Sequence, residues 1–186
     1  MKRVVCSLFL MLFALSLQAQ SVARDGLWWL HLAREQRTGY LAGTIDCQVY
    51  EAGNKKLAGA SWDLLEAKIT GLYQKHAESR QLVVISVLEQ VTTNARPAAG
   101  EAHAGKHGIF DGEYWRQAEP EHRLGFVEGY RQCHNSLGEM APLGREDAWY
   151  VQNASRWYGV RDDDPGAIDE KRVNRKIADV LALQGR

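Results

Sequence analysis

The feature that most constrains this chain is an internal repeat. Residues 25–47 align without a gap to residues 111–133, and eight of the 23 aligned positions are identical. Chance would give about one or two identities over this length, so the pattern indicates that one structural unit was duplicated. The identical pairs are Asp25/Asp111, Gly26/Gly112, Trp29/Trp115, Glu35/Glu121, Arg37/Arg123, Gly39/Gly125, Gly43/Gly129 and Cys47/Cys133. We therefore expect two similar units in one chain.

The repeat also sets the expected domain organisation. We expect a signal peptide over residues 1–19, a first helical repeat over 21–91, an Ala/Gly-rich linker over 92–110 and a second repeat over 111–184. The leader has a positive start and a short apolar stretch ending near Ala19, which is typical of exported bacterial proteins. We expect the mature chain in the periplasm or outside the cell, without membrane insertion. An uncleaved N-terminal anchor is the alternative.

The spacing of apolar residues predicts helices. Residues 62, 65, 69 and 72 recur at steps of three and four, and so do residues 82, 85, 88 and 91. We aligned residues 82, 85 and 88 with residues 177, 180 and 183 of the second copy. The prediction is an all-α fold with two tandem three-helix repeats, packed about a pseudo-two-fold as one compact helical domain. A short strand over residues 83–85 is the alternative.

Four glycines predict how the units meet. Gly39 and Gly43 are four residues apart, as are Gly125 and Gly129, so each pair lies on one helix face. Glycine inside a helix costs about 1 kcal/mol relative to alanine, and close packing of another backbone would explain that cost. We expect the two glycine faces to pack against each other.

The cysteines fit the same arrangement. Cys6 falls in the expected leader, which leaves Cys47 and Cys133, each four residues beyond a glycine of its unit. In an oxidising compartment an isolated pair is most simply one disulfide. Two free thiols are the alternative.

The remaining candidates point away from known catalytic motifs. No Gly-x-Ser-x-Gly, His-Glu-x-x-His or phosphate-binding glycine loop occurs, and equal numbers of basic and acidic residues without a basic run argue against nucleic acid. Trp29 and Trp115 are interpreted as structural plugs, with a glycan platform as the minor alternative. His122 and His134 each occur in one unit only, which we interpret as variation at the surface.

Two stretches of the first unit resemble the Rap/Tai family of type VI secretion immunity proteins. They are residues 39–46 (GYLAGTID) and, after an amphipathic helix, residues 75–78 (KHAE). The resemblance implies a small helical periplasmic protein that blocks a cell-wall amidase effector without catalysis. The family's Cys-x-Pro element is absent, and His76-Ala77 stands where His-Pro is common.

Two classes of function follow from these observations. The first is a non-catalytic exported binding protein, with no cofactor or metal, whose protein partner contacts the segments 51–60 and 137–145, which the two units do not share. An immunity-type inhibitor of a cell-wall hydrolase is the specific form. The alternative is an exported enzyme or metal-binding protein that uses His103, His107 and Asp111, or a structural envelope protein.

Overall fold

A computed structural model describes residues 24–92, 110–138, 141–160 and 170–185. All regular secondary structure in these ranges is helical, which confirms the predicted all-α class. The expected signal peptide, and the linker apart from its ends, lie outside the described residues. The first unit contains α2 (Gly26–His31), α3 (Arg34–Tyr50), η1 (Lys55–Leu57), α4 (Trp62–Lys75), η2 (Ala77–Gln81) and α5 (Val84–Thr92). The second contains α6 (Gly112–Gln117), α7 (Pro120–Leu137), α8 (Asp147–Trp157), α9 (Glu170–Val173) and α10 (Ile177–Gln184).

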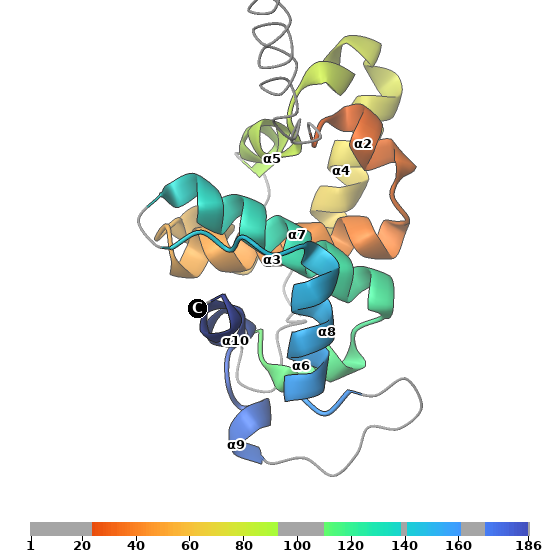
Figure 1. Cartoon of the computed structure of the whole chain (residues 1–186). Coiled ribbons are helices and arrows are strands. Elements are labelled where there is room, and N and C mark those ends of the chain that lie inside the picture. Colours follow the sequence, from red (N-terminus) through yellow and green to blue (C-terminus); the bar gives the residue numbers. More distant parts are fainter. Residues whose placement is uncertain (1–23, 93–109, 139–140, 161–169, 186) are drawn as a thin grey trace, which may run out of the picture.

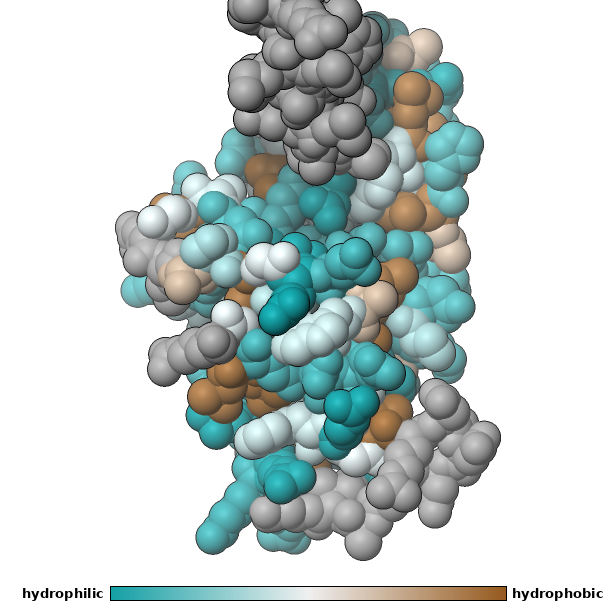
Figure 2. Space-filling view, viewed as in Figure 1, coloured by the Kyte–Doolittle hydropathy of each residue, from teal (hydrophilic) through white to brown (hydrophobic). Residues whose placement is uncertain are grey.

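Two long helices, α3 and α7, form the centre of the molecule. They lie side by side, with α2, α4 and α5 on one side of the pair and α6, α8, α9 and α10 on the other (Figure 1). No helix in the described ranges is long and apolar enough to cross a membrane. In the view of Figure 2, hydrophilic side chains predominate and apolar ones form small separate patches.

The glycines set the distance between the central helices. A Cβ added to Gly39 or Gly43 would lie 2.0 Å from the carbonyl oxygen of His122 or Phe126 respectively. A Cβ at Gly125 or Gly129 would meet a carbonyl oxygen of α3 at the same 2.0 Å. The two backbones are therefore in direct contact along both glycine faces, and they run in the same direction. These contacts are reciprocal, whereas the pseudo-two-fold relation of the whole units stays a prediction.

The three-helix count is wrong, because each unit begins with a separate short helix and the second unit also contains the short helix α9. Asp25 and Asp111 cap α2 and α6, and each carboxylate accepts two backbone N–H groups at 3.0–3.2 Å. Both short helices end where Leu32 and Ala118 adopt extended backbone conformations. In the second unit Glu119 precedes Pro120, and a residue before proline is disfavoured in the helical region.

Trp29 and Trp115 hold these short helices against the units. Both side chains are fully buried. The indole N–H of Trp29 donates to Thr70 Oγ1 at 2.9 Å, and that of Trp115 donates to Ser155 Oγ at 3.1 Å. The two acceptors lie on α4 and α8, so each tryptophan ties the start of its unit to the helix that follows the central one.

The predicted alignment of the last helices is wrong by two residues. The backbone N–H of Val84 donates to Arg24 O, and that of Ile177 donates to Phe110 O, both at 2.9 Å. Val84 is therefore the counterpart of Ile177, and the strand alternative fails because α5 begins at that residue. The matched buried triplets are residues 84, 87, 88 and residues 177, 180, 181. Leu82 and Leu183 of the predicted alignment are instead exposed.

The two flanks of the central pair differ in chemistry. On one flank Asp147 accepts from Arg131 and, at 3.4 Å, from Arg24. On the other flank the counterparts of Arg24 and Asp147 are Phe110 and Trp62, whose rings lie 5.6 Å apart. Corresponding contacts between the two units are thus ion pairs on one flank and aromatic packing on the other.

The glycine contact gives a matched pair of substitutions. Gly43→Ala should lower the free energy of unfolding by about 3 kcal/mol or more, because its Cβ meets backbone that has no room to move. Gly71→Ala in α4 should raise it by about 0.5–1 kcal/mol, because a Cβ there meets nothing within 4 Å. Guanidinium denaturation measures both. Equal effects of the two substitutions would contradict the contact.

Candidate functional site

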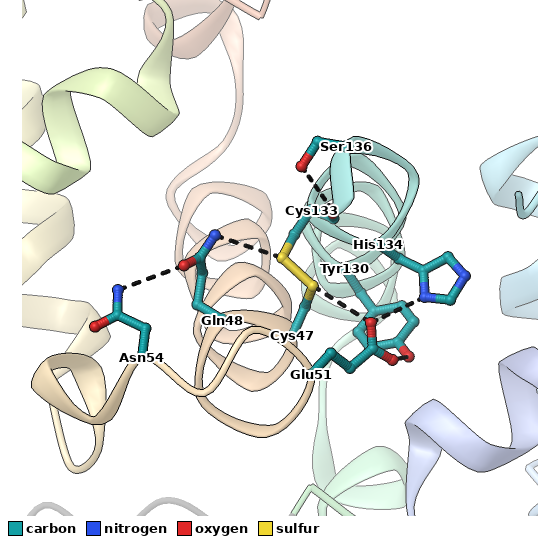
Figure 3. The surroundings of a disulfide bond; sticks show 8 residues. All are labelled: Cys47, Gln48, Glu51, Asn54, Tyr130, Cys133, His134 and Ser136. Atoms are coloured by element: carbon teal, nitrogen blue, oxygen red, sulfur yellow. Dashed lines mark hydrogen bonds and ion pairs between the residues drawn. A yellow bond between two sulfur atoms is a disulfide. The ribbon is translucent and has the colours of Figure 1, made fainter. Parts of the chain in front are cut away.

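The candidate site lies at the end of the central pair where Cys47 and Cys133 are joined. Their Cα atoms are 6.1 Å apart, and the two residues are 86 positions apart in the chain. Both cysteines are fully buried in the last turns of α3 and α7 (Figure 3). The predicted disulfide between Cys47 and Cys133 is present. It holds together the helix ends from which the two predicted partner-contact segments begin.

Glu51 connects these two segments. Its carboxylate accepts the Tyr130 hydroxyl through one oxygen and lies 2.9 Å from His134 Nδ1 through the other (Figure 3). His134 Nε2 lies 3.2 Å from the carbonyl oxygen of Ala141. Both ring nitrogens thus face oxygen atoms. The buried His134 side chain therefore joins the segment that begins at Glu51 to the segment that contains Ala141.

The anionic carboxylate affects its phenolic neighbour. Burial and the negative charge of Glu51 raise the pKa of Tyr130 above its ordinary value. The phenol stays protonated and serves as a hydrogen-bond donor. Its role is to orient Glu51, and no phenolate nucleophile forms at this position.

The two segments share a buried anchor, contrary to the expectation that they are unrelated. Leu57 and Leu143 are 4% and 2% exposed, and they are separated by the same interval as the cysteines. Most of the described residues around the two leucines are exposed. Lys55, Lys56 and Arg145 are among the exposed side chains. In its described residues, each segment is therefore exposed on the surface and anchored to the core by one leucine.

Tyr50 and Lys176 extend this end of the molecule, and the sequence analysis missed both. Tyr50 is 50% exposed, and the Lys176 ammonium lies 4.6 Å from the centre of its ring. Lys176 precedes α10, so the contact brings the end of α3 to the start of the last helix. We call Tyr50, residues 51–60, residues 137–138 and 141–145, and Lys176 the disulfide end.

Asp46 is a buried acid just inside the disulfide end. Burial raises its pKa from 3.8 to about 7, the Lys176 cation opposes this shift, and the Glu51 and Asp179 charges add to it. Its counterpart Gln132 accepts the Tyr40 hydroxyl. Tyr40 is matched by Phe126, which has no hydroxyl to offer Asp46. The two units thus differ here by one carboxylate.

His122 also lies between the units, so the interpretation of His122 and His134 as surface variation is wrong. Its Nδ1 is 3.1 Å from Thr38 Oγ1, and its Nε2 contacts the Tyr114 hydroxyl. Thr38 donates its own hydrogen to Glu35 O, so it accepts from His122. Burial raises the pKa of Tyr114 well above its ordinary value. The chain of contacts resembles a catalytic relay, but it ends in a neutral phenol and serves to join α3 to α6.

Of the three candidate metal ligands, only Asp111 lies in the described residues. His103 and His107 lie outside the described residues, and Asp111 is fully buried as the cap of α6. Over the ranges that the structure covers, no three His, Cys, Asp or Glu side chains are arranged to hold a metal ion.

Comparison with known proteins returned no relative. No protein-family model, no curated protein and no solved structure matches the chain.

Removal of the disulfide tests how the disulfide end is held. Cys47→Ala combined with Cys133→Ala should lower the free energy of unfolding by up to about 4–5 kcal/mol, because the bond closes a long loop in the unfolded chain. Denaturation with and without reductant measures the effect, and the reduced native protein should match the double variant. A midpoint insensitive to reductant would contradict the bond.

Asp46 should make stability depend on pH. Because its folded pKa is raised, its contribution is fully present below pH 3.8 and is lost as the pH rises through about 7. Asp46→Asn should therefore stabilise the protein by up to about 4 kcal/mol more above this window than below it. Denaturation at both ends of the window measures the difference.

Proposed function

We propose that this chain is an exported, non-catalytic binding protein and that a protein partner docks on the disulfide end. The observation that carries the proposal is the contact chain from Glu51 through His134 to Ala141, next to the bond between Cys47 and Cys133. Two loops from distant parts of the sequence are held together in one position before any partner arrives.

Preorganisation of this kind favours binding. A partner that docks on mobile loops must offset the entropy lost when they become ordered, and a braced surface avoids most of that cost. The disulfide fixes the helix ends, and the buried Leu57 and Leu143 fix the middle of each loop. The disulfide also fits an oxidising compartment, as the expected signal peptide does.

The side chains that this surface exposes are suited to recognition. Tyr50 is half-exposed beside Lys176, and Lys55, Lys56 and Arg145 add positive charge. Tyrosine and arginine are enriched among the residues that dominate binding energy, and the cations favour an acidic partner surface. An immunity-type inhibitor of a cell-wall amidase effector, the function implied by the Rap/Tai resemblance, fits these requirements.

Inhibition of a purified type VI amidase effector tests the proposal. Peptidoglycan cleavage should stop when the protein is added in equimolar amount. Lys55→Glu combined with Lys56→Glu should weaken inhibition by about tenfold or more, because repulsion replaces attraction at the interface. Arg156→Glu, at an exposed charge on α8, serves as the control and should leave inhibition unchanged.

Two results would overturn the proposal. One is an absence of both binding and inhibition across amidase effectors of this class. The other is inhibition that the Lys55→Glu/Lys56→Glu variant and the Arg156→Glu control weaken equally, because the contact would then lie elsewhere on the molecule.

A further inference from the structure

A groove between α4 and α5 lies apart from the disulfide end. It has a volume of about 370 Å³ and opens to solvent. Its apolar lining comes from Ala67, Leu72 and Val91, and its charged lining includes Lys68 and Lys75. A volume of this size is within the range of sites that bind small molecules or peptide side chains.

Gly71 keeps this groove open. It lies in the interior of α4, where glycine costs about 1 kcal/mol relative to alanine. The four glycines between α3 and α7 are explained by backbone contact, but a Cβ at Gly71 would meet nothing within 4 Å. Packing within the described residues therefore gives no reason for a glycine here. Its effect is to leave space in the groove that a side chain would fill.

The second unit shows that the fold does not require this space. The matched hydrogen bonds to Thr70 and Ser155 make Arg156 the counterpart of Gly71 and Trp157 the counterpart of Leu72. The Trp157 ring is covered by the guanidinium carbons of Arg172 and Arg175, at 5.2 and 5.9 Å from its centre. The same helical frame thus carries an exposed arginine and a covered tryptophan ring in one unit, and an open groove in the other.

The charges indicate what the groove would bind. Within the described residues, the ammonium groups of Lys68 and Lys75 make no ion pair or hydrogen bond, whereas the His76 side chain is paired with Glu78 at 3.3 Å. The two lysines are seven residues apart on α4, so they lie about 10 Å apart on one face. Two unpaired cations flanking an apolar floor are complementary to two carboxylates that flank apolar side chains.

We propose that the groove binds an acidic, partly apolar segment of a protein partner. In a polyproline II conformation, which has three residues per turn, residues three positions apart lie on the same face and about 9 Å apart, close to the spacing of the lysines. Carboxylates at that interval would pair with Lys68 and Lys75. The small side chains between them would cover Leu72 and Val91 and occupy the space above Gly71. This site is independent of the partner surface proposed at the disulfide end.

A peptide titration followed by amide NMR tests the proposal. The probe is a synthetic peptide in which glutamate recurs at every third residue, with leucine and alanine between. Its addition should shift the amide resonances of α4 and α5. Lys68→Glu combined with Lys75→Glu should weaken binding by about tenfold or more, and Gly71→Leu should weaken it by filling the groove. The Lys55→Glu/Lys56→Glu variant is the matched control and should bind as the native protein does.

Several outcomes would overturn the proposal. Shifts elsewhere, or equal shifts with lysine in place of glutamate in the probe, would remove the charge argument. Movement of the groove resonances on removal of residues 98–109 would make the chain itself the occupant. A concentration-dependent dimer that the Lys68→Glu/Lys75→Glu variant abolishes would make a second copy the occupant. An unchanged amidase inhibition by that variant would leave the function proposed for the disulfide end intact.

Discussion

Direct contact between the backbones of α3 and α7 is the constraint on which the rest of the structure depends. Each of the four glycines faces a carbonyl oxygen that leaves no room for a Cβ. At this separation the cysteines at the helix ends can be joined, and Glu51 can reach Tyr130 and His134. A wider separation of α3 and α7 would break all of these contacts. The disulfide end therefore depends on the four glycines, although glycine lowers the helix propensity of both helices.

The two units share one arrangement of helices, and they can carry different side chains at positions that this arrangement does not constrain. The flanks of the central pair are closed by ion pairs around Asp147 on one side and by rings around Phe110 on the other. Gly71 of α4 and Arg156 of α8 also occupy corresponding positions with different side chains. These differences mark surfaces at which the two units are unlike, and the groove proposed beside Gly71 is one of them.

The sequence predicted the features that depend on matched spacing and missed those that depend on contacts between the units. Gly39, Gly43 and Cys47 recur at one interval, so the central pair and its disulfide could be anticipated. His122 and His134 looked unmatched because each has a partner in the other unit, Thr38 and Glu51 respectively, and no local pattern encodes such a contact. The alignment of α5 with α10 failed because the segments between helices differ in length, and an apolar repeat fits equally well after a shift of two residues. The interval between Leu57 and Leu143 was the one overlooked signal for the loops.

The reciprocal contacts across the central pair have a consequence for how such a molecule arose. A chain holding a single unit would present one glycine face and one cysteine, and a second identical chain would complete both. Each cysteine would then meet its own copy, as in an isologous dimer. Fusion of two such genes would turn an assembly that depends on concentration into an intramolecular one, and later substitutions could then act on one half alone.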